Sequence, residues 1–231
     1  MRTLVLWDID HTLIKVTGFS RVMYAEAFLQ VTGRPLEQLA PMAGRTERAI
    51  SSETLLLHGI TPTDPLVESL TTALASAFTA RRHEIDAHGH ALPGAHAALD
   101  ALAVRDEAVQ SVLTGNVRTV AVHKLAAFGL DHLVDFEVGA YGTDHIDRPP
   151  LVRLAQRRAH RKYAHPFDAA TTVLVGDTPH DVAAGRQGGA RVIAVATGFS
   201  DEDTLRAAGA DLVLPDLSDT ATLVKAILRT D

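Results

Sequence analysis

The 231-residue sequence contains no cysteine, so disulfides, thiolate metal sites and a cysteine nucleophile are excluded. No apolar run approaches the roughly 18 residues that a membrane-spanning helix needs. The net charge is −6 and no long block carries one sign, which argues against a nucleic-acid partner because such proteins present a basic face. Asp8 interrupts the first apolar stretch before a signal-peptide core is complete, so a cytoplasmic location is expected by default.

What the chain does contain is an alternation of short apolar runs and longer helical patterns. Six runs rich in β-branched residues predict strands, at 3–7, 108–113, 133–138, 171–175, 191–196 and 211–214. Helical spacing falls between them, over 95–103, 118–128, 150–161, 179–187, 202–208 and 218–228. Since strands covered on both faces are apolar throughout, the alternation predicts a parallel sheet wrapped by helices, which is a doubly wound, Rossmann-like α/β fold.

One region breaks this alternation. Between residues 15 and 90 there is no convincing strand, and apolar side chains such as Leu66, Leu70 and Leu74 recur at helical spacing. We therefore expect a small helical domain, residues 15–90, that is inserted after the first strand. The α/β core is then formed by residues 1–14 and 91–231.

Polar side chains stand where three of the predicted strands end. The first strand finishes on Asp8 and Asp10, the run over 108–113 leads into Thr114, and the run over 171–175 leads into Asp177 and then Asp181. In an open α/β sheet, ligands bind outside the carboxyl ends of the strands. The sequence therefore places a polar site at one edge of the sheet.

The residue types at this edge suit a cation and a phosphate group. Several carboxylates in one crevice raise each other's pKa unless a cation neutralises them, and Mg²⁺ is bound by carboxylates, waters and phosphate oxygens. Thr114 offers a hydroxyl, and Gly115-Asn116 before a predicted helix offer N–H groups. One aspartate could attack phosphorus, and the other could protonate the leaving oxygen and then activate water.

These motifs resemble those of the haloacid dehalogenase superfamily of phosphohydrolases. The family's D-x-D-x-T motif stands at residues 8–12, its apolar run ending in Ser or Thr at 112–114, and its G-D-[ST]-x-x-D motif at 176–181. The insertion after the first motif is similar to the helical cap shared by phosphoglycolate phosphatases and β-phosphoglucomutases. The resemblance implies a Mg²⁺-dependent phosphatase that acts on a small phosphorylated metabolite through an aspartyl-phosphate.

The resemblance also assigns roles to residues by position. It makes Asp8 the nucleophile and a Mg²⁺ ligand, and Asp10 the general acid/base whose backbone carbonyl also binds the metal. Thr114 binds the transferring phosphoryl group. Asp177 is the third protein ligand, and Asp181 supports the metal directly or through water.

The third motif of the family supplies a lysine that neutralises the nucleophile and the phosphoryl oxygens. Here Arg148, which precedes Pro149, stands at the matching place. Arginine supplies positive charge and two donors, although it does not replace a compact ammonium group without consequence. Lys124 is the rival for this role, and the sequence places it further along a helix.

Further candidate substrate contacts are Gly115, Asn116, Arg45 and Thr46. By resemblance, the G-x-T segment that holds Arg45 and Thr46 faces the active site from the cap. The alternative is that Thr46 caps a helix that begins with Glu47. His11 and His180 flank the acids in the sequence and are further candidates for substrate contact.

Three other functions are alternatives to the phosphatase. Dehalogenation is disfavoured because a halide leaving group needs no proton donor, whereas Asp10 supplies one. A sugar phosphomutase could use the same residues, with transfer of the phosphoryl group to another sugar oxygen instead of water. A non-enzymatic regulatory domain that binds metal or phosphate needs neither the inserted cap nor an acid two residues after its phosphoacceptor.

Overall fold

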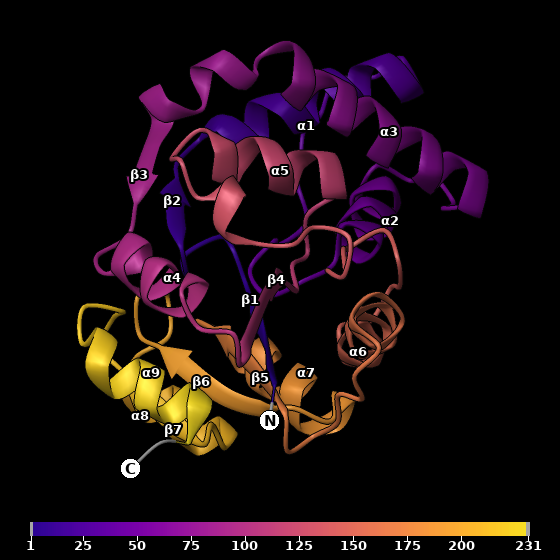
Figure 1. Ribbon diagram of the computed structural model, residues 1–231. Helices are drawn as coiled ribbons and strands as arrows, with labels where there is room; N and C mark the ends of the chain where they lie inside the picture. The colour runs from indigo at the N-terminus through magenta and orange to yellow at the C-terminus, as the bar shows by residue number, and fades with distance from the viewer. Residues whose placement is uncertain (1, 230–231) are drawn as a thin grey trace.

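A parallel sheet of five strands forms the centre of the computed structural model, which describes residues 2–229 (Figure 1). Its order is β4-β1-β5-β6-β7. The side chains of β1 are all buried because β1 is a central strand with helices over both faces. The bounds of these strands are β1 (Thr3–Trp7), β4 (Ala108–Val112), β5 (Thr172–Gly176), β6 (Arg191–Val195) and β7 (Leu212–Leu214).

Helices cover both faces of this sheet. Val5 and Trp7 of β1 pack in one cluster with α4, α5 and α9, while Leu4 and Leu6 point the other way, against α6 and α7. This alternation follows from the two-residue period of a strand. The doubly wound α/β prediction is confirmed, and the helix bounds are α4 (Ala95–Ala103), α5 (Arg118–Ala126), α6 (Pro149–Tyr163), α7 (Pro179–Gly188), α8 (Glu202–Ala208) and α9 (Thr220–Leu228).

The inserted segment is helical, and it lies with α5 at one end of the molecule (Figure 1). It consists of α1 (Phe19–Thr32), α2 (Glu47–Leu57), α3 (Asp64–Ala80) and two 3₁₀ turns, Arg82–Glu84 and Asp86–His88. Its side chains form their own apolar cluster, which also includes Val120 of α5. Within residues 2–229, no helix is both long and apolar enough to cross a membrane.

The sequence predicts no strand within residues 15–90, and this prediction is wrong at both ends of the segment. β2 (Ile14–Val16) pairs antiparallel with β3 (Gly89–Ala91), so the chain leaves and re-enters the α/β core side by side. Such three-residue strands carry too few side chains to show a period in the sequence. The predicted boundaries at 14 and 91 fall in this ladder, and the division into core and cap stays a prediction.

The strand predicted at 133–138 is also wrong. A 3₁₀ turn, Asp131–Leu133, begins the segment, and only single hydrogen bonds join it to β4, such as that from the Asp135 amide to the Gln110 carbonyl. The Asp135 carboxylate also accepts a hydrogen bond from the hydroxyl of Tyr163. The segment is apolar because it covers the edge of the sheet without joining the ladder.

Candidate active site

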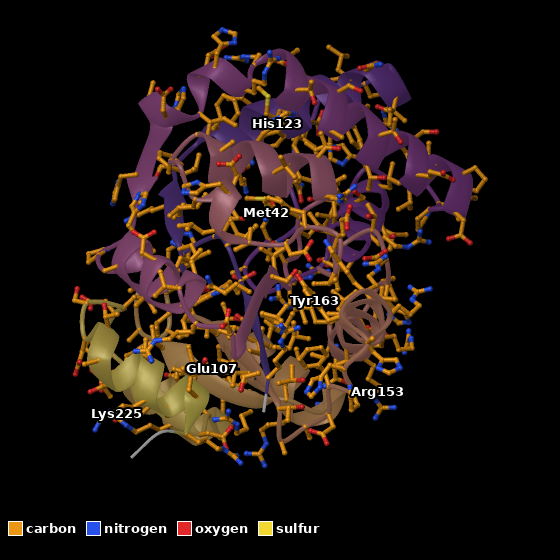
Figure 2. All side chains as sticks on the ribbon, viewed as in Figure 1. Met42, Glu107, His123, Arg153, Tyr163 and Lys225 are labelled. Atoms are coloured by element: carbon orange, nitrogen blue, oxygen red, sulfur yellow. The ribbon has the colours of Figure 1, made fainter. Side chains whose placement is uncertain are left out.

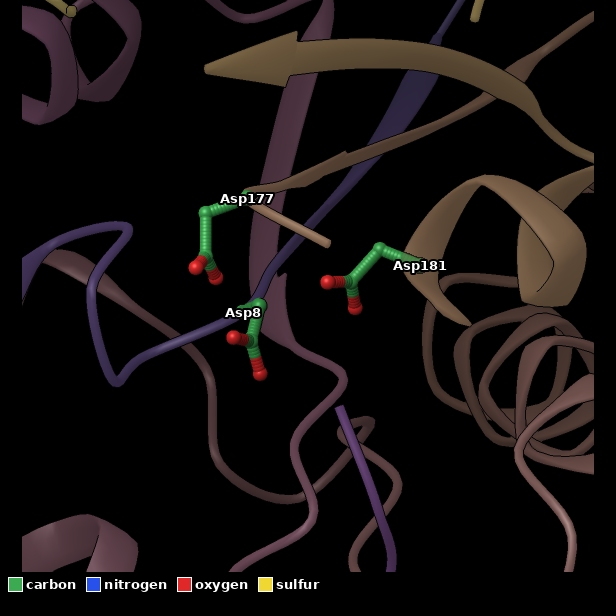
Figure 3. Close-up of side chains that lie close together, drawn as sticks. All are labelled: Asp8, Asp177 and Asp181. Carbon is green, nitrogen blue, oxygen red and sulfur yellow. The ribbon is translucent and has the colours of Figure 1, made fainter. Parts of the chain in front are cut away.

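Three aspartates meet at the carboxyl ends of β1 and β5 (Figure 3). Asp8 follows β1, Asp177 follows β5, and Asp181 lies in the first turn of α7. Each offers a carboxylate oxygen that lies within 4.8 Å of the other two, and all three residues are buried. The sequence-predicted juxtaposition of these acids is therefore present in the structure.

Asp181 is fixed by the way α7 begins. Thr178 is the N-cap, and its side chain accepts a hydrogen bond from the Asp181 amide. In return, Oδ2 of Asp181 accepts hydrogen bonds from the Thr178 amide and hydroxyl, at 3.1 and 2.6 Å. This reciprocal capping box holds the Asp181 carboxylate in place and leaves its Oδ1 to accept a hydrogen bond from Arg148.

Arg148 brings a positive charge into the cluster. Its Nη2 donates to Oδ1 of Asp8 at 3.3 Å and to Oδ1 of Asp181, and its side chain is 6% exposed. The arginine side chain reaches the cluster from the residue before α6. One guanidinium against three carboxylates leaves a deficit of positive charge that a divalent cation would fill.

The ionisation of the cluster also indicates a cation site. Burial raises the pKa of Asp8, the neighbouring Asp181 raises it further, and Arg148 only partly offsets both effects. Burial likewise raises the pKa of Asp177, with Asp8 and Asp181 adding to it. Three oxygen donors without sulfur or imidazole match the preference of a hard ion such as Mg²⁺. The donor set therefore fits the predicted metal.

Asp10 does not join the three acids; it lies in a separate network with two side chains from the end of β4 and from α5. Nζ of Lys124 donates to both carboxylate oxygens of Asp10, each at 2.7 Å, and Nδ2 of Asn116 donates to Oδ2 at 2.7 Å. Nζ of Lys124 also donates to Oδ1 of Asn116 at 2.9 Å. The expected metal contact of Asp10 through its backbone carbonyl stays a prediction.

Lys124 controls the charge of Asp10. Burial alone would raise the pKa of Asp10, but the charge and hydrogen bonds of Lys124 and the hydrogen bond from Asn116 outweigh it, so the pKa is lowered. The lysine side chain is only 4% exposed, and its ammonium lies 5.8 Å from the ring centre of Phe78 in α3. The structure thus brings both Arg148 and Lys124 to the acids, one to Asp8 and the other to Asp10.

Thr114 and Gly115 follow β4 and lie next to the network around Asp10, to which Asn116 links Thr114. Thr114 is fully buried, and its hydroxyl accepts hydrogen bonds from the amide and the side chain of Asn116 at 3.2 and 2.8 Å. A Cβ added to Gly115 would lie 1.9 Å from the carbonyl oxygen of Arg45. Only glycine allows the inserted segment to approach this strand end so closely.

The beginning of α2 is docked on the core at this point. The Glu47 amide donates to the Gly115 carbonyl at 2.9 Å, and the Thr46 hydroxyl donates to the carbonyl of Ile146. Thr46 is also the N-cap of α2, since its hydroxyl accepts from the Ala49 amide. The helix-cap interpretation of Thr46 is confirmed, and its hydroxyl is already engaged on both sides.

Arg45 lines an open cleft without contacting the acids. The cleft has a volume of about 600 Å³, and Arg148 and His180 also line it. Arg45 forms an ion pair with Glu53 at 2.6 Å and donates to the carbonyl of Pro41 at 3.1 Å. The structure therefore places Arg45 at the entrance, outside the network around the acids.

Comparison with known families identifies the class of protein. The profile of the family described as haloacid dehalogenase-like hydrolase matches residues 5–186, which span both the carboxylate cluster and the inserted helices. The chain therefore belongs to the haloacid dehalogenase-like hydrolase family. The family predicted from the motifs is confirmed, and so is the prediction of an enzyme of this hydrolase class.

Individual relatives place the chain among enzymes named as phosphatases. It is 29% identical over 93% of its length to the plasmid-encoded phosphoglycolate phosphatase of Cupriavidus necator, of which 90% is covered. It is 32% identical to a probable phosphatase, IndB, of Dickeya dadantii, in an alignment that covers 52% of this chain and 50% of the relative. That second match thus spans about half the length of the relative.

Solved structures share the whole fold. A hydrolase from Pseudomonas syringae superposes with a TM-score of 0.64 at 22% identity, covering 98% of this chain and 99% of that one. CbbY from Rhodobacter sphaeroides, solved in complex with phosphate, gives a TM-score of 0.68 at 18% identity, covering 95% and 96%. The α/β core with its inserted helices is therefore a shared architecture.

The network around Asp10 gives a first prediction. Substitution Lys124→Met removes the cation that lowers the pKa of Asp10, and it should reduce the free energy of unfolding at neutral pH by about 2 kcal/mol, a value discounted for the partial exposure of Asp10. A carboxylate with a lowered pKa stabilises the fold above its ordinary pKa and loses that contribution as pH falls through the lowered value. The difference between the variant and wild type should therefore shrink below about pH 4.

Urea unfolding across this pH range measures the effect. Lys225→Met is a matched control, since Lys225 is exposed on α9, a helix that carries none of the site residues (Figure 2). A loss of stability in Lys124→Met that is the same at all pH values would show that Lys124 acts through packing alone.

Proposed function

We propose that the chain is a Mg²⁺-dependent phosphatase that hydrolyses a small phosphorylated metabolite through an aspartyl-phosphate on Asp8. The observation that carries this proposal is the division of the acids into two environments. Asp8 lies in a buried cluster of three carboxylates that has only the positive charge of Arg148, whereas Asp10 lies in a network with Lys124 that favours its ionised form. Two carboxylates held in different environments are suited to different steps of one reaction.

In the first half of the reaction, Asp8 attacks the phosphorus atom and the ester oxygen leaves with a proton from Asp10. The bond between phosphorus and the ester oxygen breaks as the bond to the Asp8 carboxylate forms. A doubly charged phosphate ester beside Asp10 raises the pKa of that group and so favours the protonated form that this step requires. Arg148 offsets the charge on the phosphoryl oxygens, and Thr114 orients them.

In the second half, Asp10 accepts a proton from water, which attacks the phosphorus of the aspartyl-phosphate and frees Asp8. Lys124 and Asn116 favour the carboxylate form of Asp10, which is the form that a general base needs. The start of α2 docks on Gly115, next to the network around Asp10. Exclusion of bulk water by the inserted segment would protect the aspartyl-phosphate from side reactions.

The metal would be held by Asp8, Asp177 and Asp181, with the backbone carbonyl of Asp10 as a further ligand. When bound, Mg²⁺ neutralises the phosphoryl oxygens and the carboxylates around them. Among the predicted substrate contacts, Gly115, Asn116 and Arg45 remain in the proposal. The engaged hydroxyl of Thr46 is assigned instead to holding α2 in place.

The test is phosphate release from a panel of small phosphomonoesters, with Mg²⁺ and with EDTA. Release that needs the metal and is lost in Asp8→Asn supports the proposal. Release that persists in EDTA would contradict it. A phosphomutase would instead transfer the phosphoryl group between oxygens of a sugar, and phosphorus NMR on a sugar monophosphate distinguishes transfer from release.

Metal binding should also depend on pH in a defined direction. Because Asp8 and Asp177 have raised pKa values in the folded protein, they contribute stability that is present below about pH 4 and is lost as pH rises through the raised values. Mg²⁺ competes with these protons, so the rise in melting temperature on adding Mg²⁺ should be larger at about pH 8.5 than at about pH 6. Thermal melts with Mg²⁺ and with EDTA check this, and an equal rise at both pH values would argue against Asp8 and Asp177 as ligands.

A further inference from the structure

Glu47 is a buried acid in the site for which the proposed mechanism has no use. It is the first residue of α2, it is 6% exposed, and it comes from the inserted segment rather than from the α/β core. Its Oε1 has no hydrogen-bond partner among residues 2–229. Buried carboxyl oxygens are rarely left unpaired, so an unpaired one inside a catalytic site indicates a ligand that it binds.

The position of Glu47 is fixed on the side of the site that holds the leaving group. Its amide donates to the carbonyl of Gly115 at 2.9 Å, and Gly115 is followed by Asn116, whose side chain contacts Asp10. The charges of Lys124 and Asp10 both act on the pKa of Glu47. Because Asp10 is the group proposed to protonate the leaving oxygen, we infer from its influence on Glu47 that the Glu47 carboxyl is on the side of the site that takes the alcohol part of the ester.

The two buried cations beside the site, Lys124 and Arg148, form ion pairs with acids other than Glu47. Lys124 pairs with Asp10 and Arg148 pairs with Asp8, each through contacts given above. Burial raises the pKa of Glu47 to about 8, and Lys124 only partly opposes that effect. Above about pH 8, where it is ionised, Glu47 therefore gains most from a ligand that donates a hydrogen bond to it, and it repels a ligand that carries a second carboxylate.

We propose that Glu47 determines specificity by accepting a hydrogen bond from a hydroxyl or ammonium group on the alcohol part of the phosphate ester. This proposal rests on the phosphatase proposed above, and it names the class of ester. Esters of polyhydroxy or amino alcohols are preferred, and an ester whose alcohol carries a carboxylate is disfavoured. Ser51 lies one turn further along the same buried side of α2, and its hydroxyl also has no partner among the described residues.

Four esters with the same short carbon chain, assayed at about pH 9 where Glu47 is ionised, test the proposal. They are 2-hydroxyethyl phosphate, phosphoethanolamine, phosphoglycolate and ethyl phosphate, which carry a hydroxyl, an ammonium, a carboxylate and no polar group. For wild type, the kcat/KM for the hydroxyl or the ammonium ester should exceed that for ethyl phosphate by about tenfold to a hundredfold, as expected of one hydrogen bond to a charged group. Phosphoglycolate should be the poorest substrate of the four.

At about pH 9, Glu47→Gln keeps the shape of the side chain and removes its charge. The preference for the hydroxyl or ammonium ester over ethyl phosphate should fall by at least about tenfold, while phosphoglycolate should improve relative to ethyl phosphate. Glu68→Gln is the matched control, since Glu68 is exposed on α3 and the same charge is removed from the inserted segment. Comparing ratios of kcat/KM separates specificity from any general loss of activity or folded protein.

Each result bears on one of the two proposals. Hydrolysis of ethyl phosphate without preference for the donor-bearing esters would overturn the role of Glu47 and leave the phosphatase standing. A strong preference that Glu47→Gln does not change would also overturn it. If wild type with Mg²⁺ hydrolyses neither the four esters nor any member of a wider panel of phosphomonoesters, the phosphatase is overturned, and the role of Glu47 with it.

Discussion

Substitution of Asp8 by Asn is expected to lower kcat by about four orders of magnitude or more, because it removes the proposed nucleophile. Asparagine has nearly the same shape as aspartate, so the fold should be retained. The substitution also removes one of three repelling carboxylates from a buried cluster. In EDTA, the melting temperature of Asp8→Asn should therefore equal or exceed that of wild type at neutral pH.

This combination of lost activity and retained stability distinguishes a nucleophile from a structural residue. Phosphate release from the best substrate and thermal melts in EDTA provide the two measurements. Asp100→Asn is the matched control, since Asp100 is exposed on α4 and should change neither quantity. If Asp8→Asn kept more than about one hundredth of the wild-type kcat, Asp8 would not be the nucleophile.

The α/β core could be predicted from the sequence because its signals are local. The side chains of β1 are apolar throughout since the strand is covered on both faces, and the helix over 95–103 has the predicted bounds. The acids could be predicted too, because Asp8 and Asp177 directly follow strands whose carboxyl ends face the same edge, and Asp181 stands four residues after Asp177. Those signals do not depend on the arrangement of the inserted segment.

The partners of the acids could be predicted less well. Lys124 stands on the same buried side of α5 as Val120, Ala121 and Leu125, so a helical wheel places an ammonium group on an apolar face. That signal shows burial, but it does not show which acid the lysine meets. The pairing with Asp10 depends on how α5 is oriented at the end of β4, and helix orientation is a property of the tertiary packing.

Glu47 shows a different limit of the sequence. As the first residue after the N-cap Thr46, an acid is what the helix dipole favours, and nothing local distinguishes it from a solvent-exposed helix start. It becomes a buried acid only because α2 docks on Gly115 and Gly142, residues far away in the chain. The strand predicted at 133–138 failed for a related reason, since an apolar segment can cover a sheet edge without pairing to it.

Arg148 should have the second large effect, on both activity and stability. Arg148→Ala leaves Asp8, Asp177 and Asp181 buried together without a cation, and at about pH 8 in EDTA it should lower the free energy of unfolding by about 3 kcal/mol. At about pH 6 the loss should be smaller, because Asp8 and Asp177 have raised pKa values and take up protons in the folded state. Added Mg²⁺ should restore part of the stability by supplying positive charge at the same place.

The kcat values of two variants should distinguish the effect of the positive charge of Arg148 from that of its planar guanidinium geometry. Arg148→Ala should lower kcat by about 10²- to 10³-fold, the usual effect of losing one electrostatic contact to the transition state. Arg148→Lys keeps the charge but offers no second planar donor, so it should retain most of the stability and only part of the activity. Arg153→Ala is the control, since Arg153 is exposed on the outer side of α6 (Figure 2). Wild-type turnover in Arg148→Ala would assign the cationic role to Lys124, because within residues 2–229 Lys124 is the other buried cation in contact with an active-site acid.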